Sequence, residues 1–112
     1  MAKPNFKKND FSAWEEGIRA TAAYPNVYCK VSGMVTEADW KNWSENDFLY
    51  CLDVVTEAFG MNRLLFGSDW PVCLLASSYN KVYTIVRRYY SKFSSEEQNK
   101  FWGQNAIDFY LL

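Results

Sequence analysis

The chain of 112 residues contains no histidine. Because histidine is the commonest metal ligand and the usual general base near neutral pH, any catalysis or metal binding by this chain has to use other side chains. An excess of charge of either sign is also missing, since 12 Lys and Arg stand against 13 Asp and Glu, with a net charge of −1 and a pI of about 5.4. Without a basic field, neither a nucleic acid nor a membrane is expected as a partner.

Cysteine is scarce, and long apolar runs are missing. Cys29, Cys51 and Cys73 are too few and too widely spaced for a disulfide scaffold, so we expect buried free thiols in a reducing compartment. No apolar stretch approaches the roughly 18–20 residues of a transmembrane helix, and the N-terminus has no apolar signal-peptide core. These features predict a cytoplasmic location.

Hydrophobic residues, by contrast, make up 49% of the chain, and aromatic residues make up 19%. This composition is sufficient for a packed core and argues against disorder. The aromatic side chains either fill a dense core or partly cover a surface that something else hides. Residues 1–112 are expected to form one domain or a segment of a larger one.

Apolar periodicity predicts a helix that begins at Ser12 and stops at Tyr24, and further helices over residues 47–59, 79–93 and 104–110. Ser12 and Ser94 are each followed three residues later by glutamate, the spacing of a capping box. At Ser94 this box is expected to open a further helix toward Gly103. Gly60 is expected to end the second helix in the left-handed region. Strands predicted over residues 27–32 and 63–68 alternate with these helices, which is typical of parallel βαβ connections in an α/β fold.

Two strands are too few for an independent sheet. A two-stranded parallel sheet has two open edges, and several amphipathic helices need more sheet to cover. The chain is therefore expected to be a piece of a larger α/β architecture or to self-associate.

The strand over residues 63–68 leads directly to Asp69, Trp70 and Pro71. Its nearly continuous apolar character is typical of a parallel strand covered on both faces, which would bring Asp69 to the rim of a sheet. Asp69 is thus a candidate catalytic or metal-binding carboxylate, although a role as a helix N-cap or turn residue before Pro71 explains the pattern equally well. On the strand over residues 27–32, Lys30 and Ser32 share a polar face that either meets solvent or faces a site.

The connection over residues 34–46 is rich in tryptophan and acidic residues, with a short helical turn expected from Thr36. Long connections after a strand are often functional, so this one suits a pocket wall. Simple packing of its aromatic side chains is the other interpretation.

Several motifs follow one another along the chain: CKVSG at 29–33, FG at 59–60, RLLFGSDWPV at 63–72, NA at 105–106 and FY at 109–110. Over nearly all 112 residues this set resembles the C-terminal part of the amidohydrolase-related family. The resemblance is greatest to its lactonase-like branch, which includes fuconolactonase-like and pyrone-dicarboxylate-lactonase-like enzymes.

The resemblance implies a (β/α)8 barrel with its site at the C-terminal ends of the strands, with residues 27–32 as strand seven and residues 63–69 as strand eight. Asp69 matches the strand-eight carboxylate that binds a divalent, zinc-like metal or activates water in such enzymes. Ser32 would then lie near a small-molecule substrate, and Trp70 would form a pocket wall. Lys30, one layer deeper, would need a carboxylate partner from elsewhere in the barrel.

Such a barrel needs about 250 residues. The family's His-x-His motif at strand one and its residues on strands five and six have no counterpart here, although Lys3-Pro4 resembles the end of its strand-six motif. The resemblance therefore implies the C-terminal fragment of a hydrolase acting on a lactone or a related cyclic or carboxylic-ester substrate. Alone, the fragment is expected to be inactive, to hold no metal, and to self-associate or pair with the missing barrel portion. The alternative is a non-catalytic α/β module that associates through its aromatic surface.

Overall fold

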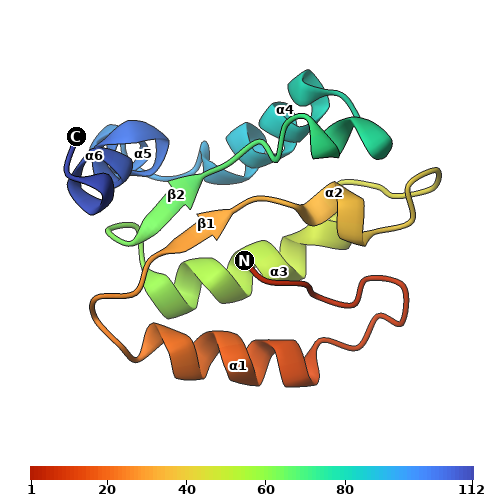
Figure 1. The fold of residues 1–112 in the computed structure, drawn as a ribbon, viewed down its shortest axis with the longest axis horizontal. Helices are drawn as coiled ribbons and strands as arrows, with labels where there is room; N and C mark the ends of the chain where they lie inside the picture. Colours follow the sequence, from red (N-terminus) through yellow and green to blue (C-terminus); the bar gives the residue numbers. More distant parts are fainter.

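The computed structural model describes every residue from Met1 to Leu112 and contains two short strands flanked by helices. Figure 1 shows α1 and α3 side by side on one side of the strands, with α4, α5 and α6 on the other. In chain order the elements are α1 (Ser12–Ala22), β1 (Cys29–Val31), α2 (Met34–Glu37), α3 (Asn46–Phe59), β2 (Leu64–Phe66), the 3-10 turn η1 (Val72–Leu75), α4 (Tyr79–Tyr90), α5 (Ser95–Asn99), the π-helical turn η2 (Lys100–Gln104) and α6 (Asn105–Tyr110). No helix combines the length and the apolar character that crossing a membrane requires.

The two strands are parallel, as predicted, but each is shorter than predicted. Three residue pairs are in register, with Cys29 opposite Leu64 and Val31 opposite Phe66. Neither outer edge has a neighbouring strand.

Single polar groups occupy both outer edges of this sheet. The N-terminal ammonium of Met1 donates to the carbonyl oxygen of Lys30 at 2.6 Å, on the free edge of β1. On the free edge of β2, the side-chain amide of Asn105 donates to the carbonyl oxygen of Leu64 at 2.9 Å. These contacts satisfy only part of the hydrogen-bonding capacity of each edge.

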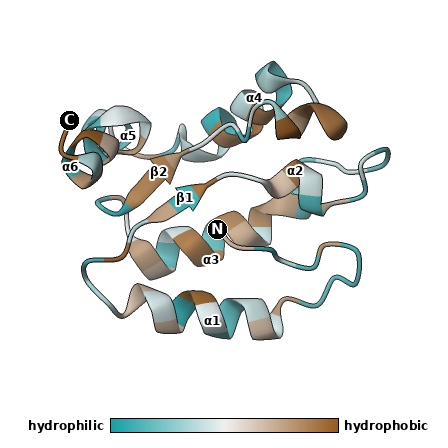
Figure 2. Cartoon of the chain, in the orientation of Figure 1, coloured by the Kyte–Doolittle hydropathy of each residue, from teal (hydrophilic) through white to brown (hydrophobic).

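The apolar stripe predicted for the second helix faces the core. The residues of α3 that are buried include Phe48, Cys51, Leu52, Val55 and Phe59. They belong, except for Cys51, to a cluster of 20 buried residues that also takes in Cys29, Val31 and Leu64 from the strands and the buried face of α4. Figure 2 shows β2 as apolar along its length, which agrees with its burial. The helix-facing side of the sheet is therefore the side predicted from strand alternation.

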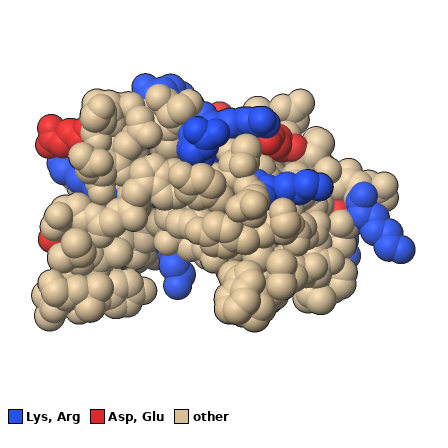
Figure 3. Space-filling model, turned by 90° about the horizontal axis from the view of Figure 1, so that it is seen from above, with Lys and Arg blue, Asp and Glu red and all other residues tan.

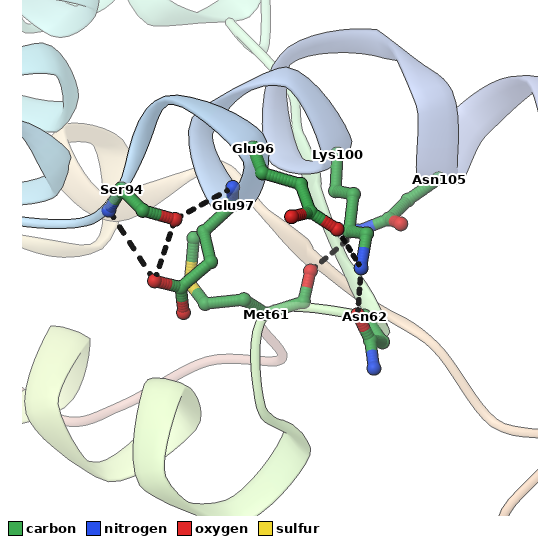
Figure 4. Close-up of polar contacts among 7 residues, drawn as sticks. All are labelled: Met61, Asn62, Ser94, Glu96, Glu97, Lys100 and Asn105. Atoms are coloured by element: carbon green, nitrogen blue, oxygen red, sulfur yellow. Dashed lines mark hydrogen bonds and ion pairs between the residues drawn. The ribbon is translucent and has the colours of Figure 1, made fainter.

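Of the two predicted capping boxes, one forms and one does not. The Ser94 hydroxyl accepts from the Glu97 N–H, and the Glu97 carboxylate accepts from the Ser94 N–H (Figure 4). The prediction for Ser12 was wrong, because its hydroxyl donates to the Asp10 carboxylate at 3.0 Å and α1 has no side-chain cap. Asp10 also accepts from the Ser12 N–H, so a local turn takes the serine that the box required.

The boundaries of several helices differ from the predicted ones. The short helix α2 begins at Met34, directly after Gly33 with φ 74°, rather than at Thr36. α3 begins at Asn46, one residue before the predicted start, and no side chain caps it. Gly60 does end α3 with a positive φ of 69°, but its ψ of 166° lies outside the left-handed helical region. The helix predicted over residues 79–93, which is α4, ends at Tyr90.

All three cysteines are free and buried, as expected. Burial raises the pKa of Cys51 to about 12, and it also raises the pKa of Cys29. A buried thiol with a raised pKa is a poor nucleophile. These residues therefore act as small apolar side chains in the core.

Replacing Asn105 by alanine is expected to lower the free energy of unfolding by about 2 kcal/mol, because two buried carbonyl oxygens lose their donor. Asn105 is 3% exposed, and its amide donates to Met61 O at 2.7 Å as well as to Leu64 O. Figure 4 shows it reaching from α6 to the segment before β2. Urea unfolding of the variant and the parent at equal protein concentration measures the difference.

The matched control is Asn62→Ala, which removes an exposed asparagine next to Met61. Its amide oxygen accepts only from Lys100 Nζ at 3.1 Å. This change is expected to alter the stability by no more than about 0.5 kcal/mol. Equal losses in the two variants would contradict the role assigned to Asn105.

Candidate active site

Asp69 follows β2 at the carboxyl end of the parallel sheet. Its side chain is partly exposed, and its backbone has a φ of 59°. A positive φ is uncommon for residues other than glycine, although aspartate tolerates it better than most. Backbone conformations of this kind concentrate at functional sites, where packing on both sides holds them.

The Asp69 carboxylate reaches across to the residues that follow β1. A Cβ atom placed on Gly33 would lie 3.7 Å from Asp69 Oδ2, so the carboxylate lies over this glycine. The Thr36 hydroxyl is 3.4 Å from the same oxygen and 3.1 Å from the carbonyl oxygen of Gly33. The site thus joins the carboxyl ends of both strands.

The turn interpretation of Asp69 accounts for its backbone but not for its side chain. The carbonyl oxygen of Asp69 accepts from the Cys73 N–H at 2.8 Å and so starts the turn η1. The N-cap position of η1 is nevertheless Pro71, and no side chain caps it. The carboxylate is left to face Gly33 and Thr36, where it can accept a proton or bind a cation.

Lys30 and Ser32 lie on the face of the sheet that the helices do not cover. A Cβ atom on Gly67 would lie 3.0 Å from the Lys30 side chain and 3.0 Å from Ser32 Cβ. Both residues therefore share the face of Gly67, in agreement with the predicted alternation. Lys30 is exposed and has no carboxylate partner in this chain, whereas Ser32 is partly buried.

Trp70 lies directly after Asp69 but is not packed. Its side chain is 64% exposed and pairs with no other aromatic ring. Its N–H donates to Ser68 Oγ at 3.2 Å, and the peptide bond to Pro71 is cis. Within this chain the Trp70 indole is therefore exposed beside Asp69, and no other aromatic ring packs against it.

Three features at this site were not predicted from the sequence. Thr36 contacts Asp69, the Trp40 indole N–H donates to the Thr36 carbonyl oxygen at 2.8 Å, and Lys3 Nζ lies 3.7 Å from Glu37 Oε1. In the sequence, only the length of the connection after the first strand indicated that this segment could contribute to a site. Contacts between residues 1–10 and this connection are long-range, so local patterns do not reveal them.

The largest groove of the molecule is not at Asp69. It measures about 830 Å³ and lies between α1 and the open edge of β1, where Trp14, Ile18 and Cys29 contribute to its lining. A smaller groove of about 380 Å³ lies next to the site, with Thr36, Glu37 and Trp40 in its lining. The smaller groove adjoins the candidate site, because Thr36 lines it and also contacts Asp69.

Asp69 alone does not make a metal centre. No group of three or more His, Cys, Asp or Glu side chains in this chain is arranged to hold a metal ion. The Asp69 carboxylate suits a divalent cation as one oxygen ligand. Further ligands would have to come from a part of the protein outside these residues.

A parallel βαβ arrangement with a carboxylate at the carboxyl end of a strand is typical of enzymes built on (β/α)8 barrels. The amidohydrolase family model matches residues 1–112, and the chain belongs to this family. It is 44% identical to L-fucono-1,5-lactonase of Burkholderia multivorans over 118 residues, which cover 99% of this chain and 40% of that protein.

Two crystal structures of an amidohydrolase from Burkholderia multivorans have the same fold over the matched region. The structure with bound zinc is 45% identical, has a TM-score of 0.87, and aligns with 91% of this chain and 38% of its own. The structure with bound HEPES is 42% identical, has a TM-score of 0.91, and aligns with 97% of this chain and 42% of its own. The chain thus spans about two fifths of the length of these relatives, and the predicted fold class, the C-terminal part of a (β/α)8 barrel, is confirmed.

Proposed function

We propose that this chain is the C-terminal part of a hydrolase that opens a lactone, with Asp69 as its central catalytic group. The observation that carries the proposal is the Asp69 carboxylate, held at the carboxyl end of β2 and directed toward Gly33 and Thr36. The relative named L-fucono-1,5-lactonase supports a sugar lactone as the substrate.

In this proposal Asp69 takes a proton from water as the water oxygen attacks the lactone carbonyl carbon. The bond between that carbon and the ring oxygen then breaks. The proton passes from Asp69 to the departing ring oxygen, so the products are one carboxylic acid and one hydroxyl group. Each water molecule consumed opens one ring.

A divalent metal fits the same position, since the zinc-bound relative belongs to this family and Asp69 offers a carboxylate oxygen. A bound metal ion lowers the pKa of water and stabilises negative charge on a carbonyl oxygen. Asp69 would supply one ligand in the complete enzyme. The remaining ligands would come from the barrel strands that this chain does not contain.

Ser32, Lys30 and Trp70 are proposed to contact the substrate. Ser32 and Lys30 lie on the uncovered face of the sheet beside Gly67, and Trp70 presents an exposed indole after Asp69. A hydroxyl, an ammonium and an aromatic face together suit a ligand that is partly polar and partly apolar. A cytoplasmic location stays a prediction of the composition.

The partner proposed for this chain is the remainder of the barrel, present either in the same polypeptide or as a second chain. The exposed large apolar side chains include two groups, one around η1 and one at the C-terminus, formed by Trp70, Val72, Leu74, Leu75, Phe109, Tyr110, Leu111 and Leu112. Figure 3, seen from the side of α4, α5 and α6, shows a broad area without charged side chains. Exposed apolar surface of this extent is typical of an interface, so the isolated chain is expected to self-associate.

The test is a fusion protein in which residues 1–112 follow the N-terminal part of the Burkholderia multivorans lactonase that this chain does not match. With zinc present, the fusion protein is expected to hydrolyse L-fucono-1,5-lactone, because it restores the complete set of strands. Release of acid, followed by titration at constant pH, measures the rate. The isolated chain at the same concentration is expected to show no hydrolysis above the buffer.

Two controls make the result decisive. The parental lactonase defines full activity, and circular dichroism with light scattering shows whether the fusion protein is folded and homogeneous. A folded fusion protein without activity would contradict the proposed function. A strictly monomeric isolated chain with cooperative unfolding would contradict the proposed partner.

A further inference from the structure

The groove of about 380 Å³ beside the site is lined in part by Lys3, Thr36, Glu37 and Trp40. We infer that this groove binds the hydroxyl groups of a polyhydroxylated lactone, an inference that rests on the proposed function. Thr36 joins the groove to the reacting position, because it lines the groove and its hydroxyl lies 3.4 Å from Asp69 Oδ2. A lactone whose carbonyl lies at Asp69 can therefore place its ring hydroxyl groups in the groove.

Trp40 supplies a flat surface in this groove. Trp40 is 48% exposed, so part of its ring is accessible to a ligand. The indole N–H donates to the Thr36 carbonyl oxygen at 2.8 Å, which holds the ring in one orientation before any ligand arrives. Because the ring is already ordered, a sugar can place its C–H face against it with little further loss of side-chain entropy.

Lys3 and Glu37 supply a donor and an acceptor side by side. Their charged atoms are 3.7 Å apart, with the lysine side chain 83% exposed and the glutamate 31% exposed. An ammonium only donates hydrogen bonds and a carboxylate only accepts them, whereas each sugar hydroxyl can do both. Two neighbouring hydroxyl groups can therefore bind this pair, one to each charge.

The experiment compares L-fucono-1,5-lactone with δ-valerolactone, which has the six-membered ring but no hydroxyl groups, in the fusion protein with zinc. Trp40→Ala is expected to lower kcat/KM for the sugar lactone by about ten-fold relative to kcat/KM for δ-valerolactone, mainly through KM. Trp40→Phe, which keeps an aromatic face, is expected to recover most of the loss. Tyr24→Ala, which removes an aromatic side chain that is 65% exposed, serves as the matched control and leaves the ratio unchanged.

Binding of the product acid makes the test independent of turnover. Calorimetry with L-fuconate is expected to show binding about ten-fold weaker for Trp40→Ala and for Glu37→Ala, while pentanoate binding is unaffected. An equal loss for both lactones or for both acids would overturn the subsite, even if the fusion protein hydrolyses lactones. A folded fusion protein that binds L-fuconate through Trp40 but hydrolyses nothing would overturn only the proposed function.

Discussion

Asp69→Asn is expected to lower kcat for lactone hydrolysis by the fusion protein by about 10³-fold. Asparagine has nearly the same shape as aspartate and can still occupy the position over Gly33. Its amide cannot accept a proton from water and is a poor ligand for a divalent cation. The loss therefore follows whether the carboxylate acts on water directly or through a bound metal ion.

Steady-state rates with L-fucono-1,5-lactone at saturating zinc measure this effect, and Asp108→Asn is the matched control. Asp108 lies on α6, is exposed, and accepts from Gln104 Nε2 at 2.8 Å. The control variant is expected to keep the parental kcat. A fully folded Asp69→Asn fusion protein with near-parental turnover would remove Asp69 from the mechanism.

Tyr90→Ala is expected to lower the free energy of unfolding by about 3–5 kcal/mol. The Tyr90 side chain is completely buried, its ring stacks on Phe101 with centroids 4.1 Å apart, and its hydroxyl lies 2.8 Å from Thr56 Oγ1. The substitution leaves a cavity between α3, α4 and η2 and removes one hydrogen bond. Urea unfolding followed by circular dichroism measures the loss, at equal protein concentrations for variant and parent.

Tyr90→Phe separates packing from hydrogen bonding. It keeps the ring and removes only the hydroxyl, so a loss of about 1 kcal/mol is expected. If Tyr90→Ala does not fold, Tyr90→Phe still tests the hydrogen bond, because its smaller loss of unfolding free energy can be measured by itself. Similar losses in both variants would show that the stacked ring contributes little, contrary to the packing argument.

Much of the fold follows from patterns within short segments. The apolar spacing from Phe48 to Phe59 predicted the buried face of α3, and the capping box at Ser94 and Glu97 formed as expected. The box at Ser12 did not form, because Asp10 accepts from both the N–H and the hydroxyl of that serine. The two boxes differ because Asp10 competes for the hydrogen bonds of Ser12. The spacing of serine and glutamate does not reveal such a competitor.

The candidate site was predictable only in part. An apolar strand that ends in Asp69, together with the alternation of Lys30 and Ser32, predicted which residues share the uncovered face of the sheet. The contact of Thr36 with Asp69 spans 33 residues, and the ion pair of Lys3 with Glu37 joins the N-terminal segment to α2. Such pairs depend on how the connections fold back over the strand ends, where no local periodicity applies.

By itself, the sequence determined the parallel βαβ order, the buried sides of its strands and longer helices, and the position of one carboxylate after β2. These properties depend on the period of apolar side chains and on where a buried run ends, both of which are local. Only the tertiary structure decided that the Asp69 carboxylate faces Gly33 and Thr36, and that Trp40 is held beside them. The physical reason is that these contacts form between segments brought together by packing, so their geometry depends on the whole core and not on any one stretch of residues.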